Sequence, residues 1–175
     1  MDNIEGASAL VDLKPNNQQF LDDVLSGLES TPKTLPCKYL YDQRGSELFD
    51  DICALDEYYL TRVEDQIIKR HAREMAEQLG AGVQLVEYGS GSSTKTRALL
   101  DELIEPAAYV PVDISREHLD LTAQSLSAAY PQLQVMPVCA DFTKSFALPS
   151  SQRTPTHAAV FFPGSTIGNF ERAEV

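Results

Sequence analysis

Two glycines in the middle of the chain form the pattern with the clearest chemical meaning. An apolar run from Val83 to Tyr88 leads into Gly89 and Gly91, and the hydroxyl-rich residues after them favour the start of a helix. Glycine has no Cβ, so a ligand can approach the backbone of such a loop closely. A helix start adds unpaired N–H groups that attract anions. The pattern therefore indicates a site for a nucleotide-type cofactor.

Acidic residues at the ends of the next two predicted strands narrow the choice of cofactor. Asp113 follows the glycine loop by one βα unit, where a carboxylate can accept hydrogen bonds from both hydroxyls of a ribose. Asp141 comes one strand later and can receive the amino group of an adenine, with Phe142 giving the ring an apolar face. Glu87 precedes the loop and can either fix it or meet a cationic group. The alternative for each acid is a solvated strand end.

A dinucleotide site is the rival explanation of the glycine loop, and it would make the protein a nicotinamide-dependent oxidoreductase. Its fingerprint is GxGxxG, in which the third glycine lets the helix pack closely. Here the third position is Thr94, and no second phosphate-binding feature follows. S-adenosylmethionine carries an adenosine without a pyrophosphate, so it suits the loop and the two acids. Lys95 can reach this cofactor from the first helical turn or stay solvated.

The elements that must position these residues alternate between strands and helices. The sequence predicts strands over 83–88, 109–112, 134–138 and 158–162, and intervening helices over 93–103 and 115–129. This alternation implies an α/β fold with a parallel sheet and right-handed crossovers. Ligands of such a sheet bind beyond the carboxyl ends of the strands, where Gly89, Asp113, Asp141 and Gly164 are expected.

The residues before the predicted sheet have a helical pattern. Apolar spacing predicts helices over 17–28 and 61–79, and Gly80 is a suitable stop for the second. Between them, Tyr39 to Tyr41 is predicted as a short extended piece. Ser46 is predicted as the N-cap of a short helix.

The fourth predicted strand ends shortly before the last residue, Val175. A doubly wound sheet usually continues beyond its switch point, so this strand would be an open apolar edge. We expect the chain to be truncated after the fourth strand. A dimer that covers the edge is the alternative.

Composition excludes several classes of partner. The 175 residues carry a net charge of −12, which argues against a nucleic-acid surface, and 43% of them are hydrophobic, as in a globular protein. There is no secretory signal and no apolar run of membrane-spanning length, so we expect no membrane contact. Cys37, Cys53 and Cys139 form no CxxC pair, which predicts free thiols in the cytoplasm and no metal site.

Four motifs follow one another along the chain: LYDQRGSELFDDICALDEYYLTRVE over 40–64, EYGSGSSTKT over 87–96, YVPVDIS over 109–115 and FFPGSTIGNF over 161–170. Together they resemble one known family, the histidine-specific, S-adenosylmethionine-dependent methyltransferases. Its members make hercynine for ergothioneine biosynthesis by trimethylating the α-amino group of histidine. The resemblance implies a Rossmann-like class I methyltransferase sheet within residues 65–175. It also implies that residues 1–64 are an N-terminal helical segment of the substrate-binding domain.

The resemblance also implies roles for individual residues. It implies cofactor contacts at six positions: Tyr41, Gly89, Lys95, Asp113, Asp141 and Phe142. We add Gly91, the second glycine of the loop, as a seventh. The amino-acid substrate is expected to meet Tyr58 and Asn169, in a site shaped by Phe49 and Gly164. The amide of Asn169 can meet both the carboxylate and the amine of an amino acid. The ring of Tyr58 can attract a methylammonium group.

Methyl transfer from a sulfonium requires orientation more than a protein nucleophile. The acceptor amine must lose its proton before each attack, and Tyr58 is the candidate acceptor of that proton. With Asn169 it forms the predicted catalytic pair. Two alternatives stay open: a methyltransferase acting on another small amine or amino acid, and a non-catalytic fragment.

Overall fold

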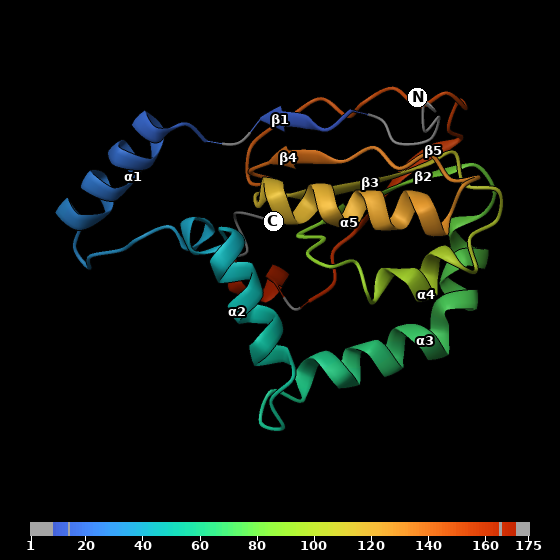
Figure 1. Ribbon diagram of the computed structural model, residues 1–175, viewed down its shortest axis with the longest axis horizontal. Coiled ribbons are helices and arrows are strands. Elements are labelled where there is room, and N and C mark those ends of the chain that lie inside the picture. The colour runs from blue at the N-terminus through green and yellow to red at the C-terminus, as the bar shows by residue number, and fades with distance from the viewer. Residues whose placement is uncertain (1–8, 14, 165, 171–175) are drawn as a thin grey trace.

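The computed structural model describes residues 9–13, 15–164 and 166–170. Its centre is a five-stranded parallel sheet in the order β1-β4-β3-β2-β5 (Figure 1). The strands are β1 (Val11–Leu13), β2 (Val83–Tyr88), β3 (Ala108–Asp113), β4 (Val138–Ala140) and β5 (His157–Phe161). The predicted α/β class with a parallel sheet is confirmed.

The strand order places a switch point beside β2. From β2 the chain moves outward to β3 and β4, then crosses back to β5 on the opposite side of β2. Loops at the carboxyl ends of strands diverge at such a point, which leaves a crevice where ligands bind. The glycine loop leaves β2 at this position, so the topology agrees with the site that the sequence predicts.

Burial explains why these runs become central strands. Val83, Leu85 and Val86 of β2 and Val110 and Val112 of β3 are at most 1% exposed. Strands buried on both faces read as nearly continuous apolar runs rather than as alternating ones. One face of the sheet packs against α4 (Thr96–Leu100) and α5 (Arg116–Ala129), and Figure 1 shows α5 lying along the sheet in front of β3.

The N-terminal residues form a less buried arm. It consists of α1 (Asn17–Glu29), the 3-10 helix η1 (Cys37–Leu40) and α2 (Gln43–Cys53), and none of the three has a buried residue among those described. Figure 1 shows α1 projecting away from the sheet. Helix α3 (Leu60–Leu79) then joins this arm to the sheet, burying Ile68, Ala72 and Ala76. Its C-cap is Gly80, as predicted.

Two predictions about the arm were wrong. Tyr39–Tyr41 is not extended, because the N–H groups of Tyr39 and Tyr41 donate to Pro36 O and Lys38 O, each at 3.3 Å, in 3-10 turns. Ser46 is not the N-cap of α2. Asp42 is, because its Oδ1 accepts the N–H of Gly45 at 2.7 Å, while Ser46 N already donates to Asp42 O within the helix.

Three elements in the sheet region also differ from the predictions. Helix α4 covers Thr96–Leu100 rather than 93–103, because Ser93 has φ +50°, which a helix does not allow. Strand β4 begins at Val138 rather than Gln134, because Pro137 cannot donate to the ladder and leaves only an isolated bridge between Val135 and Tyr109. Strand β1 was not predicted at all.

The edge predicted for the last strand is present. Within the described residues β5 pairs only with β2, and Val160 on it is 58% exposed. A short 3-10 helix, η2 (Thr166–Asn169), follows it. Over the part of the chain that the structure describes, no helix has the length and apolar character to cross a membrane.

Candidate functional site

The glycine loop folds back over the end of β3. Gly89 has φ +67° and Gly91 has φ +48°, both in the left-handed region that glycine adopts without strain. The N–H groups of Gly89 and Ser90 donate to Val112 O at 2.9 and 3.2 Å. A Cβ built on Gly91 would meet nothing within 4 Å, so the loop has open space beside its backbone. A ligand can therefore approach the loop as predicted.

Glu87 fixes this loop from beneath. It is 2% exposed, and its Oε1 accepts the hydroxyl of Thr96 at 2.6 Å while its Oε2 accepts the hydroxyl of Tyr109. Burial raises the pKa of Glu87 to about 7, although both hydrogen bonds oppose the rise. Of the two roles predicted for Glu87, the structure supports the one of fixing the loop. Its carboxylate ties β2 to the first turn of α4 and to β3.

Asp113 is held by its own neighbourhood in the chain. Its Oδ2 accepts the N–H of Gly91 at 2.9 Å and its Oδ1 accepts the N–H of Ser115 at 3.0 Å. A carboxylate has about four lone-pair positions, so about two remain for a ligand. Two acceptors on a carboxylate that also orders the glycine loop match the two hydroxyls of a ribose.

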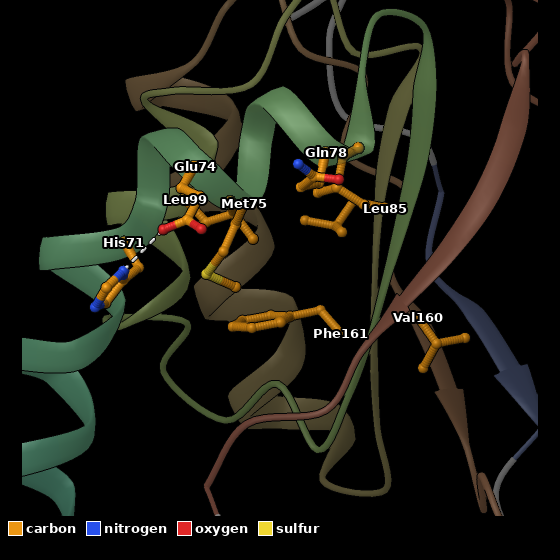
Figure 2. A pocket seen from close by; sticks show the side chains of 9 residues that line it. His71, Glu74, Met75, Gln78, Leu85, Leu99, Val160 and Phe161 are labelled. Atoms are coloured by element: carbon orange, nitrogen blue, oxygen red, sulfur yellow. Dashed lines mark hydrogen bonds and ion pairs between the residues drawn. The ribbon is translucent and has the colours of Figure 1, made fainter.

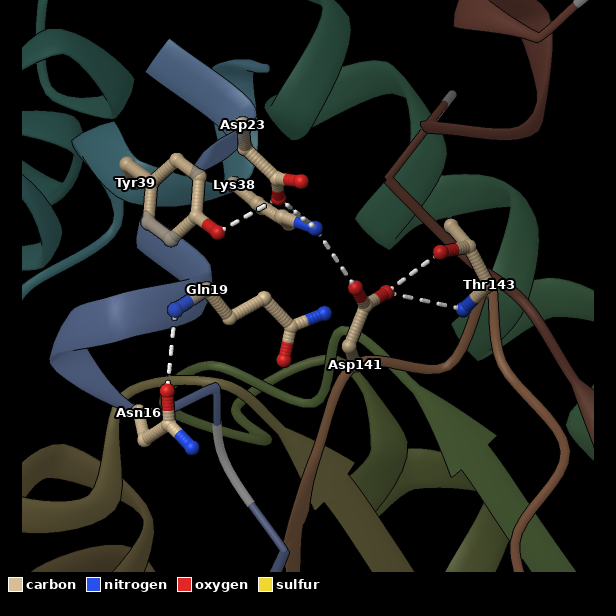
Figure 3. A network of polar contacts seen from close by, with 7 residues as sticks. All are labelled: Asn16, Gln19, Asp23, Lys38, Tyr39, Asp141 and Thr143. Atoms are coloured by element: carbon tan, nitrogen blue, oxygen red, sulfur yellow. Dashed lines mark hydrogen bonds and ion pairs between the residues drawn. The ribbon is translucent and has the colours of Figure 1, made fainter. Parts of the chain in front are cut away.

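Asp141 is held from a distance. Lys38 of η1 donates to its Oδ2 at 2.9 Å, and the backbone N–H and hydroxyl of Thr143 donate to its Oδ1 (Figure 3). Burial raises the pKa of Asp141, but the hydrogen bonds from Thr143 and Lys38 outweigh it and hold the pKa below its usual range. The group is therefore an anionic acceptor at the carboxyl end of β4.

Aromatic rings gather beside Asp141. Phe142 stacks on Tyr88 with ring centroids 5.4 Å apart and an interplanar angle of 8°, and it meets Phe162 edge-on at 5.3 Å. Phe142 is only partly buried. These rings come from the carboxyl ends of β2, β4 and β5, and of the three the sequence indicated only Phe142 as a face for an adenine.

A second row of rings lies on the N-terminal arm. Tyr41 and Phe49 have centroids 6.4 Å apart, and Phe49 and Tyr58 have centroids 6.0 Å apart, both pairs edge-to-face. Burial raises the pKa of Tyr41, and the charges of Cys37, Tyr58 and Asp113 add to the rise. The structure therefore brings three predicted site residues together, and one of them, Tyr41, lies within electrostatic range of Asp113.

Glu64 joins three parts of the site, and sequence reasoning missed it. Its Oε1 accepts the N–H of Gly164 at 2.6 Å and its Oε2 forms an ion pair with Lys95. It lies in the first turns of α3, so this helix is linked to the loops that follow β2 and β5. The available signal was its place as the last residue of the 40–64 motif. Lys95 is thus paired with a carboxylate rather than free in solvent.

Asn169, a predicted substrate-binding residue, is the last residue of η2, and its side chain lies outside the described part of the structure. Gly164 has φ +88° and is held by Glu64, so it shapes the turn that leads from β5 toward η2.

One cavity of about 470 Å³ lies away from these residues (Figure 2). It opens between α3 and strands β2 and β5, with Met75, Leu85, Leu99, Val160 and Phe161 among its lining residues. This is the face of the sheet and not the carboxyl end of its strands, and the lining lacks the strand-end acids. The cavity is therefore not the predicted cofactor site.

The strand-end residues fit an adenosine-bearing cofactor. An open glycine loop, two remaining acceptors on Asp113 and an aromatic face at Phe142 supply the contacts that a ribose and an adenine need. The model of the family described as "Histidine-specific methyltransferase, SAM-dependent" matches residues 20–175. The chain belongs to this family.

Several of the curated relatives that the chain matches are named as N-methyltransferases. Histidine N-alpha-methyltransferases from Mycobacterium tuberculosis and Mycolicibacterium smegmatis are 43% and 41% identical over 84% and 86% of this chain. The matches cover 46% and 47% of those proteins, so the chain spans about half their length. A 4-dimethylallyltryptophan N-methyltransferase, easF, from Epichloe festucae var. lolii is 29% identical over 87% of this chain and 46% of its own length.

Proposed function

We propose that the chain is the cofactor-binding part of an S-adenosylmethionine-dependent N-methyltransferase that trimethylates the α-amino group of L-histidine to hercynine, as in ergothioneine biosynthesis. The observation that carries the proposal is the pair of strand-end carboxylates. Asp113 keeps two acceptors beside an open glycine loop, and Asp141 stands at the next strand end beside the ring of Phe142. This arrangement suits adenosine, and the family relationship supplies the methyl donor.

The cofactor would be held by residues from four segments. Asp113 would receive the ribose hydroxyls, Asp141 the adenine amino group, and Phe142 one face of the ring. Gly89 and Gly91 would allow the close approach. Two further residues, Lys95 and Tyr41, would close the site from α4 and from η1. When bound, S-adenosylmethionine supplies an activated methyl group on a sulfonium.

The methyl acceptor would lie against the row of rings. Tyr58 and Phe49 offer ring faces to the methylated ammonium that forms, a cation–π contact of about 0.5–2 kcal/mol. Asn169 would meet the carboxylate and amine of the amino acid, and Gly164 would set the turn beside it. Histidine is chosen over other acceptors because the mycobacterial relatives carry that substrate in their names.

The chain's residues would contribute orientation and proton transfer. Aligning the amine with the methyl carbon and excluding water supply much of the acceleration in a reaction of this type. Tyr58 would relay the proton that the amine loses before each attack, passing its own hydroxyl proton to water as it receives the one from the amine. We propose that residues 1–64 belong to the substrate-binding domain and residues 65–175 to the cofactor-binding domain. Tyr41 of the first would reach the cofactor, and Gly164 and Asn169 of the second would reach the substrate.

A second acceptor class follows from one relative. The Epichloe protein is named for an N-methylation of a tryptophan derivative, so members of the family accept amines other than histidine. A binding site built from aromatic rings does not by itself select imidazole over indole. Histidine and tryptophan must therefore be compared as methyl acceptors by experiment.

The test is mass spectrometry of products formed by the full chain with S-adenosylmethionine. With L-histidine we expect products heavier by one, two and three methyl groups, ending in the trimethylated form. Nα-acetyl-L-histidine, whose amine is blocked, should give none, and L-tryptophan should react far more slowly. Turnover of tryptophan but not of histidine would leave the methyltransferase assignment intact and overturn the substrate.

Two variants test the assigned roles. Asn169→Ala should raise the histidine KM while the affinity for S-adenosylhomocysteine stays unchanged. Asp120→Ala, on the outer face of α5 where its partner is Gln124, is the matched surface control and should change neither. An unchanged histidine KM in Asn169→Ala would reject the role given to that side chain.

We also infer a cytoplasmic location from the free thiols, and a dimer formed through the β5 edge. Light scattering tests the dimer directly. Val160→Lys, which places a charge on the exposed edge, should shift the mass to that of a monomer, whereas a monomeric parent protein rules the dimer out.

A further inference from the structure

Lys38 lies between two carboxylates that come from distant parts of the chain. Its Nζ is 2.9 Å from Asp141 Oδ2 and 3.1 Å from Asp23 Oδ2, and the hydroxyl of Tyr39 donates to the same Asp23 oxygen at 2.6 Å (Figure 3). The side chain of Asp141 is 5% exposed and that of Lys38 is 20% exposed. The pair is thus largely removed from water, where charge–charge contacts are stronger than at the surface.

The chain leaves and returns to the same corner of the sheet. Leu13 at the end of β1 pairs with Ala140 of β4, the residue before Asp141. The arm then runs through α1, and Lys38 brings it back to Asp141 itself. The part of the chain that carries α1, between Leu13 and Lys38, is therefore fastened at both of its ends beside one strand-end carboxylate.

The hydrogen bonds of Asp141 determine what it can still accept. Among the described residues, Thr143 donates twice to Oδ1 and Lys38 donates once to Oδ2. Of about four lone-pair positions on a carboxylate, about one remains, and it is on Oδ2. Thr143 alone would fix one oxygen and leave the other without a partner, so the direction of the last acceptor depends on Lys38.

We propose that Lys38 is a positioning residue that aims the last acceptor of Asp141 at the amino group of an adenine. The proposal rests on the proposed function, because it assumes that the adenine lies at Asp141. The selectivity for an amino group over a carbonyl at this position of the purine thus depends on a residue of the N-terminal arm. With Lys38 present Asp141 stays anionic and accepts; without it, a buried carboxyl favours its neutral form, which can also donate.

The test compares two ligands that differ at that position and at the neighbouring ring nitrogen. S-adenosylhomocysteine carries the amino group and an unprotonated N1, and S-inosylhomocysteine carries a carbonyl and an N1–H. Their dissociation constants are measured by titration calorimetry for the full chain, for Lys38→Met and for Lys38→Gln. Lys33→Met is the matched control, because Lys33 lies in the same connection and bonds only to Leu28 O among the described residues.

For the parent protein we expect a preference of about 100-fold or more for S-adenosylhomocysteine, the scale on which a polar site rejects an analogue that cannot pair with it. Lys38→Met should reduce the preference to about tenfold, mainly by weakening S-adenosylhomocysteine. Lys38→Gln keeps a hydrogen-bond donor and should lie between the two. Lys33→Met should match the parent.

A structural role alone would weaken both ligands equally and leave the ratio unchanged. An unchanged ratio in a folded Lys38→Met protein therefore overturns the inference. If Lys38→Met does not fold, Lys38→Gln decides in the same way. A parent protein that binds neither ligand contradicts the proposed function as well, whereas a parent that prefers S-adenosylhomocysteine with variants that keep the full preference contradicts only the role of Lys38.

Discussion

Asp113 and Asp141 end neighbouring parallel strands, yet they are held in different ways. Asp113 is bonded by backbone N–H groups of Gly91 and Ser115, which belong to the two loops that surround it. Asp141 is bonded by the side chain of Lys38, which is 103 residues away in sequence. The first carboxylate is a product of the sheet alone, and the second depends on how the N-terminal arm docks. The side of the site that we propose for the ribose is thus built into the sheet, while the side that we propose for the adenine depends on the docking of the arm.

The largest expected effect comes from Asp113→Asn. The new amide can place its NH₂ against the N–H of Gly91 or Ser115, so the glycine loop loses an anchor and the ribose loses an acceptor. Two hydrogen bonds to a charged group are worth about 3–4 kcal/mol together, so the affinity for S-adenosylhomocysteine should fall by several hundredfold in calorimetry.

Asp141→Asn is the comparison for that measurement. Its amide still accepts from Lys38 or Thr143 and still has an acceptor for an amino group, so we expect a loss of about tenfold. If Asp141→Asn lowers the affinity for S-adenosylhomocysteine as much as Asp113→Asn does, the two carboxylates do not differ in the way described above.

The difference between the two carboxylates also explains what the sequence could predict. The glycine loop, Asp113 and the apolar strands are local features, because a strand, a turn and a helix N-terminus occupy consecutive residues. Residue type and spacing therefore predicted that the glycine loop and Asp113 lie at neighbouring strand ends, and the structure places them there. The strand-to-helix order likewise predicted the parallel sheet, since buried strands in such a sheet are continuous apolar runs.

Long-range contacts were not predictable in the same way. Glu64 contacts Gly164 at a separation of 100 residues, and nothing in the local sequence around either of them indicates the other. Strand β1 has only three residues, none of them buried, so it carries no periodic signal. The resemblance predicts Tyr41, Phe49 and Tyr58 as site residues, but only the structure shows that their rings form one row.

Glu87→Gln tests how the buried carboxyl group of Glu87 affects the stability of the fold. Because the pKa of Glu87 is raised from 4.5 to about 7, the wild-type fold has its full stability from this group below pH 4.5 and loses it as the pH rises through 7. Glutamine does not ionise, so the variant should gain stability relative to wild type across this range, by about 3 kcal/mol above pH 7.

Urea unfolding at pH 5, 6, 7 and 8 measures this difference. Glu77→Gln, whose partner Arg73 lies on the exposed face of α3, is the control and should follow the wild-type profile. Parallel profiles for Glu87→Gln and wild type would mean that Glu87 is ionised in the fold throughout this range, and that the glycine loop is anchored by a charge rather than by a titrating acid.

Gly45→Ala tests whether the adenine side depends on the docking of the arm. A Cβ at this position would lie 1.7 Å from Leu40 O, so η1 must move away from α2, and Lys38 moves with it. We expect a loss of about tenfold in affinity for S-adenosylhomocysteine, comparable to the loss of one charge-assisted hydrogen bond. Arg44→Ala, an exposed neighbour paired with Glu47, should have no effect.

Double-mutant cycles make this result specific. Gly45→Ala combined with Asp141→Asn should lose less than the sum of the two, because both variants weaken the same charge-assisted contact between Lys38 and Asp141. Combined with Asp113→Asn, the two losses should add. Additivity in both combinations would show that the arm acts on the site by some route other than Lys38.

The smallest expected effect is on the start of α2, which holds the ring of Phe49. Asp42→Ala removes the oxygen that accepts the N–H of Gly45 and should cost about 1 kcal/mol of stability in urea unfolding. Ser46→Ala should cost close to nothing, because Ser46 lies inside the helix and its N–H already bonds to Asp42 O. Histidine KM should rise slightly in Asp42→Ala, with the affinity for S-adenosylhomocysteine unchanged, since the cap supports the ring row and not the strand ends. The reverse order of the two stabilities would restore Ser46 as the cap and place the start of the helix one turn later.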